Sequence, residues 1–152
     1  MDLEAGDNVD VLGDLASGLC GLEEGRFKLI ICCSVLEHVK QPWVMAENLT
    51  KLLAQGGVLY MSVPFVWRYH AYPEDYYRFT HRGIMTLFPN LDWTEVSYST
   101  AIQGEVLPVG EQNVMHLCDK LSIFTRRRRK WFGPKEKSLP YIMFHMLGTK
   151  PV

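Results

Sequence analysis

FKLIICCSVLEHVKQPWVMAENLTKLLAQGGVLYMSV, residues 27–63, decides the fold of this chain. Its first eight residues are apolar enough to predict a strand buried on both faces, as in a parallel sheet covered by helices. Apolar residues then recur at helical spacing over 44–53, and Pro42 suits the first turn of a helix. The Gln-Gly-Gly of residues 55–57 predicts the end of that helix, because glycine readily adopts the left-handed cap.

A further apolar strand is predicted at 58–63, with Pro64 ending it. Strand, helix and strand joined by short links indicate a doubly wound α/β sheet. A right-handed crossover then makes 27–34 and 58–63 parallel neighbours. Upstream, the short apolar run at 9–13 predicts another strand, followed by Asp14 and a turn.

The second half of the chain predicts a smaller set of elements. Residues 65–77, FVWRYHAYPEDYY, form a loop that is too aromatic to be simply solvated. Thr80 is placed to cap the N-terminus of a short helix. The predicted elements are a helix at 81–88, a strand at 93–100, a helix at 111–124 and a final strand at 141–149. The last strand is expected to lie antiparallel beside its predecessor.

Composition indicates one soluble globular domain spanning residues 1–152. Apolar residues make up 47% and charged residues 22% of the 152 residues, and the net charge is −1. This balance gives no general attraction to nucleic acid or to an anionic membrane. The apolar runs are shorter than a bilayer span, and no signal peptide is visible. Adjacent Cys32 and Cys33 point to opposite faces of one strand, so reduced cysteines and a cytoplasmic location are expected, with no metal site.

Four passages, taken in order, resemble one family. They are VDVLGDL at 9–15, FKLIICCSVLEHVKQPW at 27–43, LLAQGGVLYMSVPF at 52–65 and HAYPEDYYRFTHRGIMTLF at 70–88. Together they resemble the C-terminal part of class I S-adenosylmethionine-dependent methyltransferases of the small bacterial type. The resemblance implies a Rossmann-like sheet of seven strands, mostly parallel with an antiparallel last strand, and S-adenosylmethionine as cofactor.

The resemblance also implies cofactor-binding positions. Asp14 would accept a hydrogen bond from the adenine amino group, and the backbone of Leu15 would meet the adenine ring. Asp2 would accept the ribose hydroxyls, while Cys33 and Ser34 would lie near the methionine part of the cofactor. Ligands of open α/β sheets bind at the carboxyl ends of the strands, which agrees with these positions. Two alternatives remain open: Asp14 caps a turn, and Asp2 belongs to a disordered N-terminus.

Candidate catalytic and acceptor-binding residues follow the two apolar strands. An imidazole can accept a proton at neutral pH, so His38 is a predicted general base, or it simply caps the next helix. His70, in the aromatic loop, is also predicted to be catalytic. Aromatic side chains of the loop supply area for an acceptor, and its charged side chains supply polar anchors. Alternatively, the rings pack the loop onto the core and Asp75 pairs with Arg78. Beside the two histidines, the prediction includes Tyr72 as catalytic and Trp67, Tyr69, Asp75, Tyr76 and Arg78 as acceptor-binding residues.

The family's glycine-rich cofactor loop has no counterpart before residue 9. We therefore expect a domain truncated at its N-terminus, without the first strand and helix. The strand at 27–34 would then have a bare apolar edge and one uncovered face. Either the chain associates with itself or a partner through this edge, or residues 9–13 take the vacant place.

Three functions remain open at this point. The first is S-adenosylmethionine-dependent methyl transfer to a small or glycan-type acceptor, which requires mainly positioning and a desolvated pocket. The second is a catalytically inactive interaction module that associates through the exposed sheet edge. The third is phosphate or nucleic-acid binding by the basic run from Arg126 to Lys130, against which the near-zero net charge argues.

Overall fold

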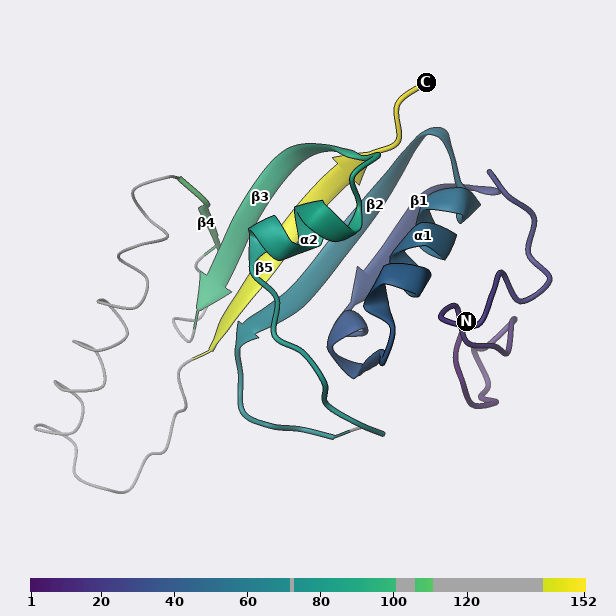
Figure 1. Ribbon diagram of the computed structural model, residues 1–152, viewed down its shortest axis with the longest axis horizontal. Helices are drawn as coiled ribbons and strands as arrows, with labels where there is room; N and C mark the ends of the chain where they lie inside the picture. The colour runs from purple at the N-terminus through teal and green to yellow at the C-terminus, as the bar shows by residue number, and fades with distance from the viewer. Residues whose placement is uncertain (72, 101–105, 111–140) are drawn as a thin grey trace, which may run out of the picture.

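The computed structural model describes residues 1–71, 73–100, 106–110 and 141–152. Within them, five strands form one mixed sheet in the order β1-β2-β5-β3-β4 (Figure 1). The strands are β1 (Phe27–Cys33), β2 (Leu53–Val66), β3 (Asp92–Thr100), β4 (Val106–Pro108) and β5 (Ile142–Thr149). The helices are the short 3-10 helix η1 (Leu36–His38), α1 (Pro42–Leu52) and α2 (His81–Leu87).

The predicted crossover is confirmed. β1 and β2 are parallel neighbours joined by α1, with Ile30 opposite Leu59 and Cys33 opposite Ser62. The amide of Ser34 continues this pairing by donating to the carbonyl of Ser62 at 2.9 Å. The carboxyl end of β1 is therefore fixed beside β2. This pairing positions η1, which follows β1, and the loop that follows β2.

The last strand is antiparallel, as predicted, and lies inside the sheet. β5 pairs with β2 on one side and with β3 on the other, antiparallel to both. β4 is also antiparallel to β3. Only the β1–β2 pair is parallel among these pairings, so the expectation of a mostly parallel sheet is wrong for the described residues.

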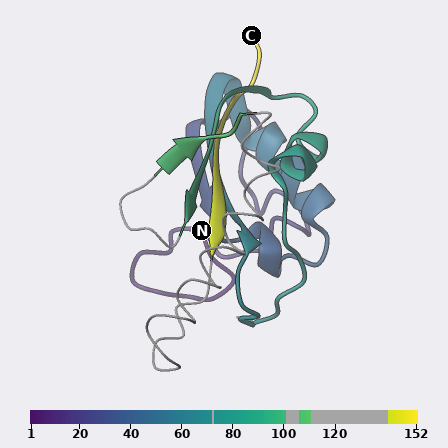
Figure 2. The ribbon, with the colours of Figure 1, turned by 90° about the vertical axis from the view of Figure 1, so that its left-hand side faces the viewer.

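Both helices cover the same face of the sheet. Figures 1 and 2 show α1 and α2 on one side of the strands. Leu59, Met61 and Phe144 on this side are at most 1% exposed. On the other side of β1, Leu29 is 55% and Ile31 66% exposed. The prediction that 27–34 is buried on both faces is therefore wrong for the described part of the chain, whereas the bare apolar edge is present.

Three boundaries differ from the sequence predictions. α1 ends at Leu52, where Leu53 turns extended and starts β2, so the Gln-Gly-Gly lies in the strand. β2 continues through Pro64 to Val66, and the register shifts between these two residues. A proline is tolerated at such an irregularity, because the pairing there does not require its missing N–H.

The predicted strand at 9–13 is also wrong. This segment makes only a single parallel bridge, between Leu12 and Asp2, and within the described residues it does not take the place beside β1. Gly13 there is packed against Cys20, whose sulfur would lie 2.4 Å from a Cβ added to the glycine. Turns on either side of the segment make it too short to pair as a strand.

The prediction at Thr80 is confirmed. Its side-chain oxygen accepts from the amide of Gly83 at 3.0 Å and caps α2. The predicted helix at 111–124 and the basic run from Arg126 to Lys130 lie outside the described residues. None of the helices that the structure describes is both long and apolar enough to cross a bilayer.

Candidate functional site

The carboxyl ends of β1 and β2 lead into the two segments that carry most of the candidate residues. β1 ends at Cys33, and Ser34 then adopts a left-handed backbone conformation with φ of 51°. This sharp turn directs the chain into η1, which contains Glu37 and His38. The loop after β2 returns over η1: the amides of Tyr76 and Tyr77 donate to the carbonyl of Glu37 at 2.8 and 3.2 Å.

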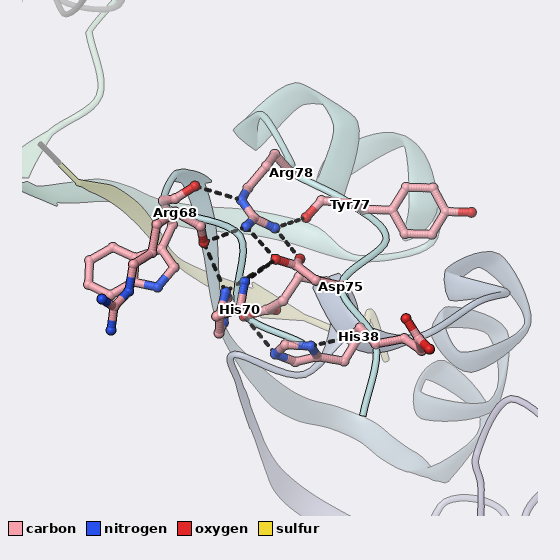
Figure 3. Close-up of polar contacts among 9 residues, drawn as sticks. His38, Arg68, His70, Asp75, Tyr77 and Arg78 are labelled. Atoms are coloured by element: carbon pink, nitrogen blue, oxygen red, sulfur yellow. Dashed lines mark hydrogen bonds and ion pairs between the residues drawn. The ribbon is translucent and has the colours of Figure 1, made fainter. Parts of the chain in front are cut away.

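Asp75 and Arg78 hold this loop in shape (Figure 3). The guanidinium donates to both carboxylate oxygens of Asp75 and also to the carbonyls of Trp67, Arg68 and Tyr77. The Asp75 side chain is 1% exposed, and the Arg78 hydrogen bonds hold its pKa well below the ordinary range. The predicted alternative, in which Asp75 pairs with Arg78, is the arrangement present, and it leaves neither group aimed at solvent as an acceptor anchor.

His38 and His70 are brought together by these two segments. Their rings meet edge to face with centroids 4.8 Å apart. Nδ1 of His38 lies 2.7 Å from the carbonyl of Glu74. Nδ1 of His70 lies 3.2 Å from the carbonyl of Arg68 and 3.3 Å from a carboxylate oxygen of Asp75, which also accepts the His70 amide at 2.8 Å. Two residues 32 positions apart, each predicted alone, therefore form one cluster (Figure 3).

Glu37 is the site residue that the sequence analysis missed. Its side chain is 1% exposed, and neither carboxylate oxygen has a hydrogen-bond partner. One oxygen lies 3.8 Å from Nε2 of His38. Burial raises the pKa of the Glu37 carboxyl above its usual range. Its position between buried Leu36 and His38 at the end of an apolar strand was the available signal, but the sequence does not show that the side chain turns inward.

Asp14 caps a turn, as the alternative held. One carboxylate oxygen accepts from the amide of Ala16 at 2.8 Å and the other from the hydroxyl of Ser17 at 3.2 Å. The next residue, Leu15, is buried, and its carbonyl accepts from Asn48 of α1 at 2.7 Å. An adenine contact by Asp14 stays a prediction, since a carboxylate accepts about four hydrogen bonds and this one has capacity left.

Asp2 lies in the same N-terminal segment as Asp14. The parallel bridge to Leu12 places Asp2 beside the stretch that leads into Asp14, on the β1 side of the sheet (Figure 1). One oxygen of Asp2 accepts from the amides of Leu3 and Glu4 at 2.7 and 3.3 Å. Both acids are solvent-exposed and are held by local backbone hydrogen bonds, and their carboxylate oxygens can accept from donors such as ribose hydroxyls or an exocyclic amine.

The remaining predicted residues lie at the carboxyl end of β1 or in the loop that follows β2. Cys33 is exposed and Ser34 follows it, at the carboxyl end of β1. Tyr69 and Tyr76 are 70% and 45% exposed, and Trp67 packs edge to face against Tyr141. Tyr72 lies outside the described residues.

Comparison with known proteins adds sequence evidence to this geometry. Residues 4–61 match the methyltransferase domain family. The matched segment includes Asp14, β1 and the Glu37–His38 pair. A curated relative, the ubiquinone biosynthesis O-methyltransferase of Paraburkholderia xenovorans strain LB400, is 35% identical over 60 residues. The match covers 40% of this chain and 26% of that protein, so the chain spans about a quarter of its length.

Solved structures show that the chain has a methyltransferase-like α/β fold. The 1,6-didemethyltoxoflavin-N1-methyltransferase of Burkholderia thailandensis, solved with S-adenosylhomocysteine, covers 89% of this chain at a TM-score of 0.51 and 15% identity, over 49% of its own length. The cyclase SpnF covers 93% at a TM-score of 0.55 and 11% identity, over 55% of its own length. Since a cyclase shares this fold, these structural likenesses identify the architecture and not the reaction.

The expected truncation is not confirmed, because the family match already starts at residue 4.

Proposed function

We propose that this domain binds S-adenosylmethionine and transfers its methyl group to a small acceptor. The observation that carries the proposal is the methyltransferase-domain match over residues 4–61, which includes every position predicted to hold the cofactor except Asp2. The methyltransferase structures with this fold include complexes with S-adenosylhomocysteine, the demethylated product of that cofactor.

The geometry supports this proposal at two places. Asp2 and Asp14 are exposed acceptors in one bridged segment, which suits the hydroxyl and amine donors of a nucleoside. The turn at Ser34 and the loop over η1 lie at the carboxyl ends of parallel β1 and β2, where ligands of such sheets bind. Methyl transfer then requires the acceptor and the sulfonium carbon to be held in line, a task for positioning groups rather than for a covalent intermediate. The exposed rings of Tyr69 and Tyr76 offer apolar area for an acceptor, small or glycan-type.

The Asp14→Asn variant gives the most specific test of the proposed cofactor site. Asparagine keeps an oxygen for the Ala16 amide, so the turn survives, but it replaces one carboxylate oxygen by an amide donor. We expect calorimetry to show binding of S-adenosylmethionine and S-adenosylhomocysteine to the wild type, weakened about tenfold in Asp14→Asn, which is the cost of one hydrogen bond to a charged group. Asp10→Asn removes an equally exposed charge nearby and should bind as wild type. Equal affinity in all three proteins would remove Asp14 from the site, and no binding to the wild type would refute the proposal for this chain.

A second candidate is an interaction module that associates through β1. Leu29 and Ile31 favour it, because they are more than half exposed on a strand paired on one side only within the described residues. Sedimentation of the same samples separates the two candidates. A concentration-dependent dimer without cofactor binding supports the module, whereas cofactor binding by a monomer supports the enzyme. Phosphate binding by Arg126 to Lys130 stays an untested prediction.

A further inference from the structure

Glu37, His38 and His70 present a set of potential metal ligands. One carboxylate oxygen and one ring nitrogen from each histidine lie within 4.8 Å of one another. Glu37 is buried, and the two histidine side chains are 15% and 32% exposed, so the group is enclosed but can be reached from the loop side. Two histidines and one carboxylate are a common ligand set for Zn²⁺ and for other divalent transition metals.

The hydrogen bonds of both histidines leave the correct nitrogen free. A carbonyl oxygen only accepts, so Nδ1 of His38 carries the proton that it donates to Glu74, and in the neutral tautomer Nε2 has the lone pair. Nδ1 of His70 faces two acceptors, the carbonyl of Arg68 and the carboxylate of Asp75, so the neutral tautomer that fits these contacts also has its lone pair on Nε2. Metal-ligating histidines almost always donate their second N–H to a carbonyl or carboxylate in this way.

The buried carboxylate of Glu37 provides an independent observation. Neither oxygen accepts a hydrogen bond, although a buried acceptor without a partner is costly. No nearby side chain donates a hydrogen bond to it: Arg78 makes its bonds to Asp75 and to backbone carbonyls, and Nε2 of His38 lies 3.8 Å from the nearer carboxylate oxygen. A cation between Glu37 and the two imidazoles would satisfy the carboxylate and both free lone pairs together.

We propose that Glu37, His38 and His70 bind one divalent transition-metal ion of the Zn²⁺ class. Bonds of about 2.1 Å in a tetrahedral site would place ligand atoms roughly 3.4 Å apart, so ligand atoms now up to 4.8 Å apart must approach by up to about 1.4 Å. Rotation of the histidine side chains supplies such a movement, because His70 lies on the loop and is one-third exposed. Asp75 is then a positioning residue, since it holds both the amide and the ring of His70.

This site goes beyond the proposed methyl transfer and does not depend on it. The ion would bind the two imidazoles that the sequence analysis predicted to be catalytic, at the edge of the sheet where an acceptor would bind. Its binding is measured without cofactor, whereas the cofactor titration is run with a chelator. Either result can fail while the other holds.

The test is a Co²⁺ titration of the whole chain after chelator treatment, followed by displacement with Zn²⁺. We expect one equivalent of Co²⁺ with visible d–d bands and no thiolate charge-transfer band, since the ligands are nitrogen and oxygen. His70→Ala and Glu37→Gln should each weaken binding at least tenfold, as loss of even an outer partner of a metal site does. His81→Asn removes a histidine outside the group and should bind as wild type.

Several results would overturn the proposal. They are no saturable Co²⁺ binding, a thiolate band indicating the cysteines, or equal affinity in wild type, His70→Ala and Glu37→Gln. Circular dichroism checks that each variant is folded. If Glu37→Gln does not fold, His70→Ala decides the matter, because its side chain is on a partly exposed loop and its loss leaves the core intact.

Discussion

Replacing Asp75 by alanine should destabilise the protein more than any surface ion pair can. The change removes a bidentate pair to Arg78 and the acceptor of the His70 amide. Breaking a buried pair costs about 3–5 kcal/mol, because the surviving charge is left without its partner. Arg78 is 25% exposed and keeps three backbone carbonyls, so water and these acceptors offset part of that cost. We expect a loss of about 2–4 kcal/mol, or roughly 5–15 °C in Tm for a chain of this size.

Urea unfolding followed by circular dichroism measures this loss. Glu47→Gln is the matched control: it breaks the Glu47–Lys51 pair on α1, whose side chains are 66% and 41% exposed. Such an exposed pair contributes about 0–1 kcal/mol. The low pKa of Asp75 means that its contribution is complete near neutral pH and is lost as the pH falls below the ordinary value of 3.8. An Asp75→Ala free energy of unfolding equal to that of Glu47→Gln at neutral pH would refute the reasoning.

Two further predictions concern packing and acidity. Gly57→Ala should lower the free energy of unfolding in urea by about 1–3 kcal/mol, because its Cβ would lie 2.8 Å from the carbonyl oxygen of Ala54 and 3.0 Å from that of Phe27. Gly6→Ala, whose nearest contact would be at 3.6 Å, should be close to neutral. Equal losses in the two variants would contradict this prediction. Burial lowers the pKa of His145 below its ordinary value of 6.5, so the unfolded chain binds this proton more readily and the free energy of unfolding should decrease as the pH drops through 6.5. His145→Gln should make this pH dependence shallower. An unchanged slope would assign the dependence to other groups.

The local signals of the sequence identified most of the elements but not all of their limits. The helical spacing before β2, the Thr80 cap and the alternation in β3 each depend on neighbouring residues, and each element formed where predicted. Pro64 is different, because whether a proline ends a strand depends on the partner across the sheet. Here the partner is β5, which is some 80 residues away along the chain.

In the candidate site, too, features that depend on neighbouring residues could be predicted, whereas features that depend on distant residues could not. His38 and His70 were recognised from their chemistry and from the strands that they follow. Their meeting depends on the loop that Asp75 and Arg78 hold, which no spacing in the sequence specifies. The chain enters the turn that carries Glu37 through a left-handed conformation at Ser34, and a serine in the sequence gives little indication of such a conformation.

The position of β5 governs when the sheet can be completed. Its residues, 142–149, lie between β2 and β3 in the sheet, so these two strands are joined only after β5, which follows both in the sequence, has been made. During synthesis on the ribosome, apolar β2 is therefore without one of its neighbours until residues 142–149 have emerged. Pairings so distant in sequence are slow to form, so folding intermediates of this chain should expose the unpaired side of β2 until β5 joins it.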